Sequence, residues 1–505
     1  MFGIRALGSR TRDVEHGSAR VAGSFGFAGR GSALHENSTR ERILDLMKNG
    51  TPDLRLSATR PEPNGLSGRG TVSRRGFLVA GAMGGAVIWG GRPVFARQAT
   101  PVASPVASIR DWRRERWIGT WAAAMHIPGP GFGELFPSQI FALDKQTVRQ
   151  IVRVSAGGDQ VRVRIANTFG DVPLVIGAAR IALRDAEERI DPTTDRVLTF
   201  SGSPSLTIPP GALAVSDPVA LRVPALSELV VSMYVPAPTT GTTVHGFAFQ
   251  TNYISPVGDF TAEAAVPVET TAQTWIFLTG IDVAVAEPAG VVVALGDSIT
   301  DGAISTPDTN QRWPDFLAER FVADTDQPAM AVLNAGIGGN RLLHNPAEGF
   351  EFAGPNALAR FDRDVLAQPG VTHLIVFEGI NDIGMPALSG DPAESVSADQ
   401  LIAGLRQLAE RSHEHGIFVF GATITPFEGA MFFSDEGEAT RQAVNDWIRT
   451  GSAFDAVLDF DAVVRDPRQP TSLRPEFDPG DHLHLNDAGF RALADSIDLE
   501  LFRAR

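Results

Sequence analysis

Residues 290–300 read GVVVALGDSIT, a short apolar run that ends at a glycine followed by polar residues. A continuous apolar run of this length is typical of a β-strand that is buried on both faces. Ser298 follows where such a strand turns into a helix, and it has two interpretations there. With Asp301 three residues on, it has the shape of a helix N-cap box, and it equally lies where a nucleophile is held.

The same alternation continues to the end of the chain. Apolar runs recur at 290–295, 330–334, 373–377, 417–423 and 456–460. Helical periodicity is found over 311–323, 356–366, 398–414, 437–450 and 487–502. Strands buried on both faces that alternate with amphipathic helices predict a parallel sheet covered by helices on each side. We therefore expect an α/β domain over residues 288–505.

The preceding region, residues 112–287, has a different pattern. Little helical period is found in it, and Gly, Pro, Asp and Thr turns separate short strand-like runs at 147–155, 159–167, 220–224 and 228–236. In the second run every other residue from Val161 to Ile165 is apolar, with arginines between them. This period of two places apolar and charged side chains on opposite faces. The region is predicted to be an all-β domain of the sandwich type.

The first 111 residues carry signals for processing and linkage. Residues 1–72 are rich in Gly, Ser and Arg without a period, and we expect them to be a disordered or untranslated leader. Residues 73–96 join a paired arginine to a short Gly/Ala-rich apolar stretch and V-F-A, which predicts a twin-arginine signal peptide and export to the periplasm or the medium. Residues 97–111 predict a Pro/Ala/Ser linker.

Charge, apolar runs and cysteine content exclude several classes of function. The chain has a formal net charge of −15, and since residues 1–96 carry +7, the remainder carries −22. An acidic body disfavours nucleic acid or an anionic membrane surface as the main partner. No apolar run reaches 18 residues, so a membrane span is not expected. The absence of cysteine excludes disulfides, thiolate metal sites and a cysteine nucleophile.

Polar, glycine-rich loops follow the predicted parallel strands. Ligands of such sheets bind at the carboxyl ends of the strands, which meet at one edge. The loops there read GDSIT (296–300), NAGIGGNR (334–341), EGIND (378–382) and DPGDHLHLNDAG (478–489). Together they bring a hydroxyl, backbone amides beside glycines, a carboxamide, and an Asp with a His to the same edge.

These groups are the parts that acyl transfer to a serine requires. Ser298 would attack, His484 would act first as base and then as acid, and Asp481 would hold the imidazole. The oxyanion would be bound by the amides of Ser298 and of the second loop, with the Asn381 side chain. The D-H-L-H segment offers two histidines, and the three-residue step from Asp481 selects His484.

The other histidine of this segment, His482, could instead pair with Asp478. Other polar residues of the loops are expected to brace them, and these are Asp297, Asn334, Asn340 and Asp382. Trp313 is expected in the core. His126 and His245 of the β region suggest no role.

The four loops, in this order and at these separations, resemble the four blocks of the SGNH, or GDSL-type, hydrolases. The resemblance implies a three-layer α/β/α, flavodoxin-like fold, a serine-ester mechanism, and no metal or organic cofactor. In the family's second block the oxyanion amide lies two residues after the Ile, which selects Gly339 over Gly338. Two positions depart from the family pattern: Ile299 replaces Leu, and Leu485 follows the His where Pro is usual.

The β region extends the resemblance, because WIGTWAAA (117–124) and the strand-like runs after it look like the N-terminal domain of a bacterial branch grouped with a xylanase-associated acetyl esterase. We therefore expect a secreted serine carboxylic-ester hydrolase that releases short acyl groups, with acetylated plant polysaccharides as the implied substrate class. The alternatives are an exported lipase or arylesterase, an acyltransferase with the same triad, and a carbohydrate-binding protein that acts through the β domain.

The expected partner is a small-molecule or polysaccharide ester. One segment of the hydrolase region, TPFEGAMFF (425–433), is rich in large apolar side chains after the fourth strand. Two roles stay open for these side chains: they wall an acyl or leaving-group site, or they pack beneath a long loop. They are Phe427, Met431, Phe432 and Phe433.

Overall fold

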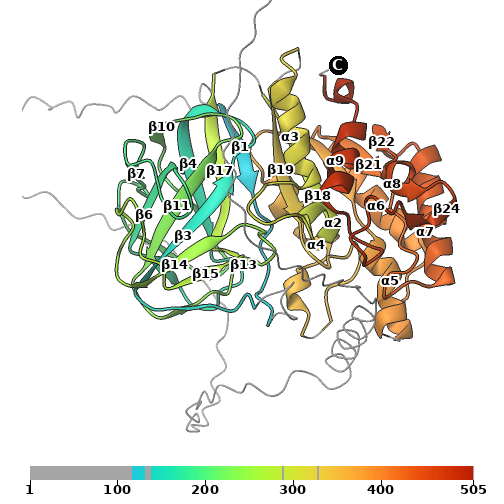
Figure 1. Ribbon diagram of the computed structural model, residues 1–505, viewed down its shortest axis with the longest axis horizontal. Coiled ribbons are helices and arrows are strands. Elements are labelled where there is room, and N and C mark those ends of the chain that lie inside the picture. The colour runs from blue at the N-terminus through green and yellow to red at the C-terminus, as the bar shows by residue number, and fades with distance from the viewer. Residues whose placement is uncertain are drawn as a thin grey trace, which may run out of the picture.

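The structure is a computed structural model that describes residues 116–130, 138–286, 289–326, 329–347, 349–389 and 391–503. The expectations for residues 1–72, 73–96 and 97–111 lie outside this part of the chain. Figure 1 shows a strand-rich region on one side and a helix-covered sheet on the other. Among the described residues, no helix combines the length and apolar character needed to cross a membrane.

The first region consists of strands. They are β1 (Arg116–Ala122), β2 (Ala142–Leu143), β3 (Gln146–Arg153), β4 (Gly158–Ala166), β5 (Leu174–Ile176), β6 (Ala178–Leu183), β7 (Arg196–Val197), β8 (Leu206–Ile208), β9 (Leu213–Val215), β10 (Val219–Val223), β11 (Glu228–Val235), β12 (Thr239–Thr240), β13 (Val244–His245), β14 (Asn252–Val257), β15 (Thr270–Ala272), β16 (Trp275–Ile276) and β17 (Leu278–Val285). The longer ones form two antiparallel sheets, ordered β1-β17-β4-β10 and β15-β14-β3-β11-β6-β7, with β9 added to β4.

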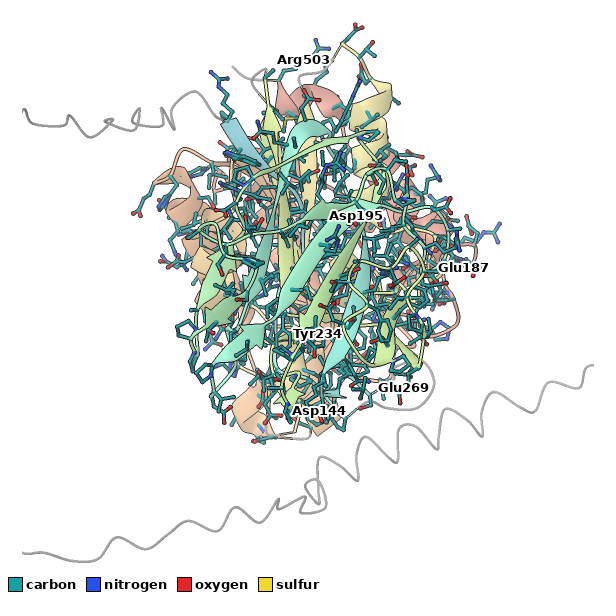
Figure 2. All side chains as sticks on the ribbon, turned by 90° about the vertical axis from the view of Figure 1, so that its left-hand side faces the viewer. Asp144, Glu187, Asp195, Tyr234, Glu269 and Arg503 are labelled. Carbon is teal, nitrogen blue, oxygen red and sulfur yellow. The ribbon has the colours of Figure 1, made fainter. Side chains whose placement is uncertain are left out.

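The predicted alternation along β4 is confirmed. Its apolar side chains, from Val161 to Ile165, are buried in a core that strands of both sheets share. Its arginines, Arg162 and Arg164, lie on the opposite face and both pair with Asp282 of the neighbouring strand β17. Figure 2 looks onto this region, with Asp195 and Tyr234 on the face turned to the viewer. The all-β prediction therefore holds for residues 116–130 and 138–286.

The second region alternates strands and helices. Its strands are β18 (Gly290–Gly296), β19 (Met330–Gly336), β20 (Val371–Phe377), β21 (Phe418–Ala422), β22 (Ala456–Leu458), β23 (Arg465–Asp466) and β24 (Gln469–Leu473). Its helices are α2 (Ser298–Asp301), α3 (Trp313–Ala323), α4 (Ala357–Phe361), α5 (Ile380–Ser389), α6 (Ala398–His413), α7 (Asp435–Thr450), α8 (Phe460–Val464) and α9 (Asp487–Ser496), with 3-10 turns η1 (Glu351–Ala353), η3 (Pro392–Glu394) and η4 (Leu499–Phe502) and a π-helix η2 (Asp362–Leu366).

Strands β18 to β22 form the predicted parallel sheet, in the order β19-β18-β20-β21-β22. The first strand of the sheet shows why it is covered on both faces. Val291, Val293 and Leu295 enter the core shared with α4, α6 and α7, whereas Val292 and Ala294 enter a second core with α3 and α9. The predicted three-layer α/β/α fold is thereby confirmed. The order in which successive strands are added reverses between β18 and β20, and ligands of doubly wound sheets bind at such a point.

The helix predictions are correct in place but differ in detail. The predicted helix 356–366 is α4 followed by the π-turn η2, and 487–502 is α9 followed by η4. Helix α7 starts earlier than predicted because the Ser434 side chain caps it by accepting a hydrogen bond from the Gly437 amide. The helix start expected at Ser298 is α2, a single turn of four residues. Helix α5 was not expected, because it contains Pro386.

The two regions pack directly against each other along β1 and β19. The Ser155 hydroxyl accepts a hydrogen bond of 3.0 Å from the Val332 amide. The Gly119 amide of β1 donates to the Pro369 carbonyl at 2.9 Å. A Cβ atom at Gly119 would lie 2.9 Å from a terminal methyl group of Leu333 of β19, so these two strands approach closely at the glycine. The β region is therefore an integral part of the hydrolase surface and not a tethered module.

The buried His373 of β20 makes stability dependent on pH. Its ring packs against those of Phe418, Phe420 and Phe502, and burial lowers the pKa of His373 to about 4. The unfolded chain therefore binds this proton first as the pH falls below about 6.5. We expect this residue alone to lower the free energy of unfolding by about 2 kcal/mol at pH 4.5 relative to pH 7.5.

Urea unfolding of the wild type and of His373→Leu at both pH values measures this contribution. The wild type should lose about 2 kcal/mol more than the variant between pH 7.5 and 4.5. Equal losses in the two proteins would show that His373 is not the acid-sensitive group.

Candidate active site

The structure brings three of the predicted residues into one hydrogen-bonded line. Ser298 is the first residue of α2, directly after β18, and His484 and Asp481 lie in the loop before α9. The Ser298 Oγ lies 2.8 Å from Nε2 of His484, and Nδ1 of His484 lies 2.5 Å from Oδ2 of Asp481. The second oxygen of Asp481 accepts the amides of Leu483 and His484 at 3.1 and 3.0 Å. The spacing of the loop therefore fixes the imidazole between a hydroxyl and a carboxylate.

The charge of Asp481 is favoured by these contacts. Burial acts to raise the pKa of Asp481, but the hydrogen bond and charge of His484, together with the two amides, hold it at about 2. The carboxylate is thus ionised across the neutral range. It can orient the imidazole and stabilise the imidazolium that forms when the ring takes a proton.

The neighbouring histidine, His482, lies away from the serine. Its Nδ1 lies 2.6 Å from Oδ2 of Asp478, and its side chain is 48% exposed. This is the pairing that the sequence left as the alternative. The loop therefore carries two Asp–His pairs, of which only the second reaches Ser298.

The interpretation of Ser298 as a helix N-cap is wrong. The N-cap of α2 is Asp297, whose side chain accepts the Ile299 amide at 2.9 Å, and Ser298 is already the first helical residue. The turn from strand to helix comes one residue earlier than the cap pattern implies. This leaves the Ser298 hydroxyl for His484, and its amide is at a position of a helix where no intrahelical acceptor exists.

The predicted oxyanion donors converge at the same edge of the sheet. Gly296, at the end of β18, is in register with Gly336 of β19 and with Phe377 of β20, so the loops after these strands meet. The nitrogen of the Asn381 carboxamide donates to the Asn340 carbonyl at 2.9 Å. Because this nitrogen carries two protons, one is left for a further acceptor.

A hydrogen bond distinguishes the amides of Gly338 and Gly339. The Gly338 amide donates to Oδ2 of Asp301 at 2.9 Å and is therefore occupied. Within the described residues, the Gly339 amide has no acceptor. Gly339 has a φ of +79°, a left-handed conformation that suits glycine. The geometry thus favours Gly339 as the donor, in agreement with the sequence prediction.

A buried arginine that the sequence analysis did not single out ties the loops together. Arg360 of α4 donates to the carbonyls of Gly296 and Ala335, at 2.9 and 2.6 Å, and to the Asn340 side chain at 2.8 Å. It also pairs with Asp364 at 3.3 Å. One side chain therefore joins the ends of β18 and β19 to the second loop. Its place in an ordinary helical stretch gave no sequence signal.

The predicted bracing residues are confirmed. Asp382 accepts the amides of Leu342 and Leu343 at 2.6 and 3.0 Å. The Asn334 side chain donates to the Thr300 carbonyl at 2.7 Å and accepts the Gly336 amide. Asn340 likewise donates its side-chain protons to two carbonyls of the loop that follows it.

Burial raises the pKa values of the carboxyl groups beneath the serine. Burial raises the pKa of Asp297 to about 7 and that of Asp382 to about 6. It raises the pKa of Glu378 well above its usual range, although one oxygen of this carboxyl lies 3.5 Å from Nη2 of Arg360. Since charge there is costly, these groups support the loops as neutral or partly neutral acids and do not compete with Asp481 for His484.

The aromatic segment after β21 is mainly part of the core. Phe427 is fully buried and packs against the rings of Phe432 and Phe433, at 6.0 and 5.1 Å between centroids. Met431 is 42% exposed. Of the two roles left open for this segment, packing applies to Phe427. Trp313 is buried in the core as predicted. Among the residues that the structure describes, no group of three or more His, Asp or Glu is placed to hold a metal ion.

Comparisons with known proteins place the site in a family. Residues 294–492 match the model of the GDSL-like lipase/acylhydrolase family. The acetylxylan esterase Axe2 from Geobacillus stearothermophilus is similar, with 21% identity, a TM-score of 0.33, and coverage of 43% of this chain and 95% of that chain. A GDSL-like lipase from Bacteroides thetaiotaomicron has 18% identity, a TM-score of 0.30, and coverage of 42% and 87%. No curated protein matches significantly.

The family match is the finding that bears on activity. It spans the loops that carry Ser298, Asn381 and His484. The region that contains this site matches the GDSL-like lipase/acylhydrolase family, and the protein is an ester hydrolase.

Proposed function

We propose that the protein is a secreted serine esterase that removes short acyl groups, acetyl above all, from plant polysaccharides through an acyl-Ser298 intermediate. The observation that carries the serine mechanism is the line of hydrogen bonds from Ser298 through His484 to Asp481. The acetyl and polysaccharide part rests on the likeness of the β region to that of xylanase-associated esterases. Export rests on the twin-arginine pattern at residues 73–96.

We assign one or more residues to each step of this mechanism. As Ser298 Oγ attacks the ester carbonyl, Nε2 of His484 takes its proton, and the amides of Ser298 and Gly339 with the Asn381 side chain bind the oxyanion. Collapse of the tetrahedral intermediate releases the alcohol, which receives the proton from His484. Water then attacks the acyl-serine, again losing its proton to His484, and the carboxylic acid leaves as Ser298 is restored.

The serine mechanism is tested with the full chain and its Ser298→Ala variant. We expect the wild type to hydrolyse p-nitrophenyl acetate and to react with a p-nitrophenyl phosphonate, adding the phosphonyl mass to the peptide that contains Ser298. The variant should lose the label and about 10⁶-fold in kcat. If both proteins are equally inert while binding to acetylated xylan persists, the carbohydrate-binding alternative replaces the esterase.

The substrate class is tested separately. Initial rates of acid release are compared for acetylated xylan, tributyrin and aryl acetates, with and without an added alcohol acceptor. Acetylxylan should be the best substrate by kcat/KM. A clear preference for tributyrin would indicate a lipase, and transfer of acetyl to the alcohol ahead of hydrolysis would indicate an acyltransferase.

A further inference from the structure

The β region reaches into the hydrolase site through one buried histidine. His245, at the end of β13, is 3% exposed, and its Nε2 lies 2.8 Å from Oδ1 of Asp301. Its Nδ1 lies 2.9 Å from the Ala124 carbonyl. Asp301 is in α2, three residues after Ser298, and its other oxygen accepts the Gly338 amide. A continuous line of hydrogen bonds thus runs from the β region to the residue next to Gly339.

The partners fix where the protons lie. A carbonyl oxygen can only accept, so Nδ1 of His245 carries a proton and donates to Ala124. Nε2 and Oδ1 of Asp301 then share one further proton. A hydrogen bond between a buried imidazole and a carboxylate is stronger than one between neutral groups. The same pair would be costly to bury without these contacts, so its geometry is tightly determined.

A second histidine holds the segment that follows His245. Nε2 of His126 accepts the Gly246 amide at 2.9 Å, and its Nδ1 donates to the Ile127 carbonyl at 2.8 Å. Burial, and then the neighbouring His245, lower the pKa of His126 to about 3. The ring therefore stays neutral and keeps the acceptor that the Gly246 amide needs.

The next residue, Phe247, packs against Gly338, the glycine whose amide is bound by Asp301. A side chain at Gly338 would lie 2.5 Å from the Cδ2 and Cε2 atoms of the Phe247 ring, so the ring rests directly on the Gly338 backbone. Phe247 is itself packed against Phe249 and Phe352, at 6.3 and 6.4 Å between ring centroids. Gly338 is thus held at its amide by Asp301 and at its Cα by Phe247.

We propose that His245 and Phe247 of the β region are positioning residues of the esterase, which fix the 338–339 peptide so that the Gly339 amide points at the oxyanion. The proposal rests on the proposed serine mechanism and adds a function for the β region. An oxyanion donor contributes only when it is aimed in advance, and a misplacement of about 1 Å costs on the order of 10²-fold in rate. Occupying the Gly338 amide leaves the next amide as the free donor.

Activity variants test the proposal on the full chain. His245→Ala, Asp301→Ala and Phe247→Ala should each lower kcat for p-nitrophenyl acetate by about 10- to 100-fold, with KM nearly unchanged. Asp301→Asn should recover most of the rate, because its oxygen can still accept from Gly338 while its nitrogen donates to neutral His245. Phe260→Ala, which truncates a ring in a separate β-region cluster, is the matched control and should retain kcat.

A thiono substrate distinguishes the loss of oxyanion positioning from a general structural defect. The sulfur anion formed from p-nitrophenyl thionoacetate is a weak hydrogen-bond acceptor, so the oxyanion donors contribute little to its reaction. The oxo/thiono rate ratio should therefore fall in the positioning variants, whereas partial unfolding would lower both rates equally. A full wild-type kcat in His245→Ala, with Ser298→Ala inactive, would overturn this proposal and leave the esterase intact.

Hydrogen exchange tests the positioning without using activity. Peptides covering residues 334–343 should exchange at least about tenfold faster in His245→Ala and Asp301→Ala than in the wild type or Asp301→Asn. Peptides from β21 should be unchanged. Equal exchange of the 334–343 peptides in all variants would overturn the proposal even if the chain proved to have no esterase activity.

Discussion

His484→Ala is expected to lower kcat for p-nitrophenyl acetate by about 10⁶-fold, whereas His482→Ala, two residues away, should stay within about threefold of the wild type. The two histidines make equivalent contacts to an aspartate, at 2.5 Å for His484 and 2.6 Å for His482. Only His484 continues to Ser298, at 2.8 Å. Loss of activity therefore depends on the proton path and not on the loop's fold.

The carboxylates extend the comparison. Asp481→Asn should cost about 10⁴-fold in kcat, because an amide favours the wrong tautomer of the imidazole. Asp478→Asn is its matched control and should leave kcat nearly unchanged. Steady-state kinetics with urea unfolding of all four variants gives the measurement. If His482→Ala lowered kcat more than His484→Ala, His482 would be the base. If Asp478→Asn lowered kcat more than Asp481→Asn, Asp478 would be the orienting carboxylate.

The sheet and the chemistry at its edge were largely predictable because each depends on local sequence. Five continuous apolar runs are the pattern that strands buried on both faces must have, and all five are strands in the structure. The three-residue step from Asp481 to His484 is short enough for spacing to determine the contact. The error at Ser298 has a local cause as well, since Asp297 is also a good N-cap and occupies that position.

What could not be predicted depends on contacts between distant residues. Asp301 contacts His245, which is 56 residues earlier, and Gly338, which is 37 residues later. No periodicity or spacing connects these positions, so Asp301 was expected to act only near its helix start. The occupied amide of Gly338 follows from the same contact. Arg360 was missed for a related reason, because a helix of ordinary composition does not show which of its polar residues faces inward.

Asn381→Ala is expected to lower kcat by about 10²- to 10³-fold, equivalent to about 3 kcal/mol of transition-state stabilisation, with a much smaller change in KM. The Asn381 carboxamide donates one proton to the Asn340 carbonyl and has a second proton for the oxyanion. The loss of the first bond adds a stability cost of about 1 kcal/mol, which has to be separated from the catalytic effect.

A matched asparagine provides that separation. Asn356 caps α4 by accepting the Ala359 amide, so Asn356→Ala should cost about 1 kcal/mol of stability and leave kcat unchanged. Asn381→Ala should resemble it in urea unfolding but differ in rate, and its oxo/thiono ratio should fall because the lost donor serves the oxygen anion. If the ratio stayed at the wild-type value while kcat fell, Asn381 would act by bracing the Asn340 loop, and the oxyanion would depend on the Ser298 and Gly339 amides alone.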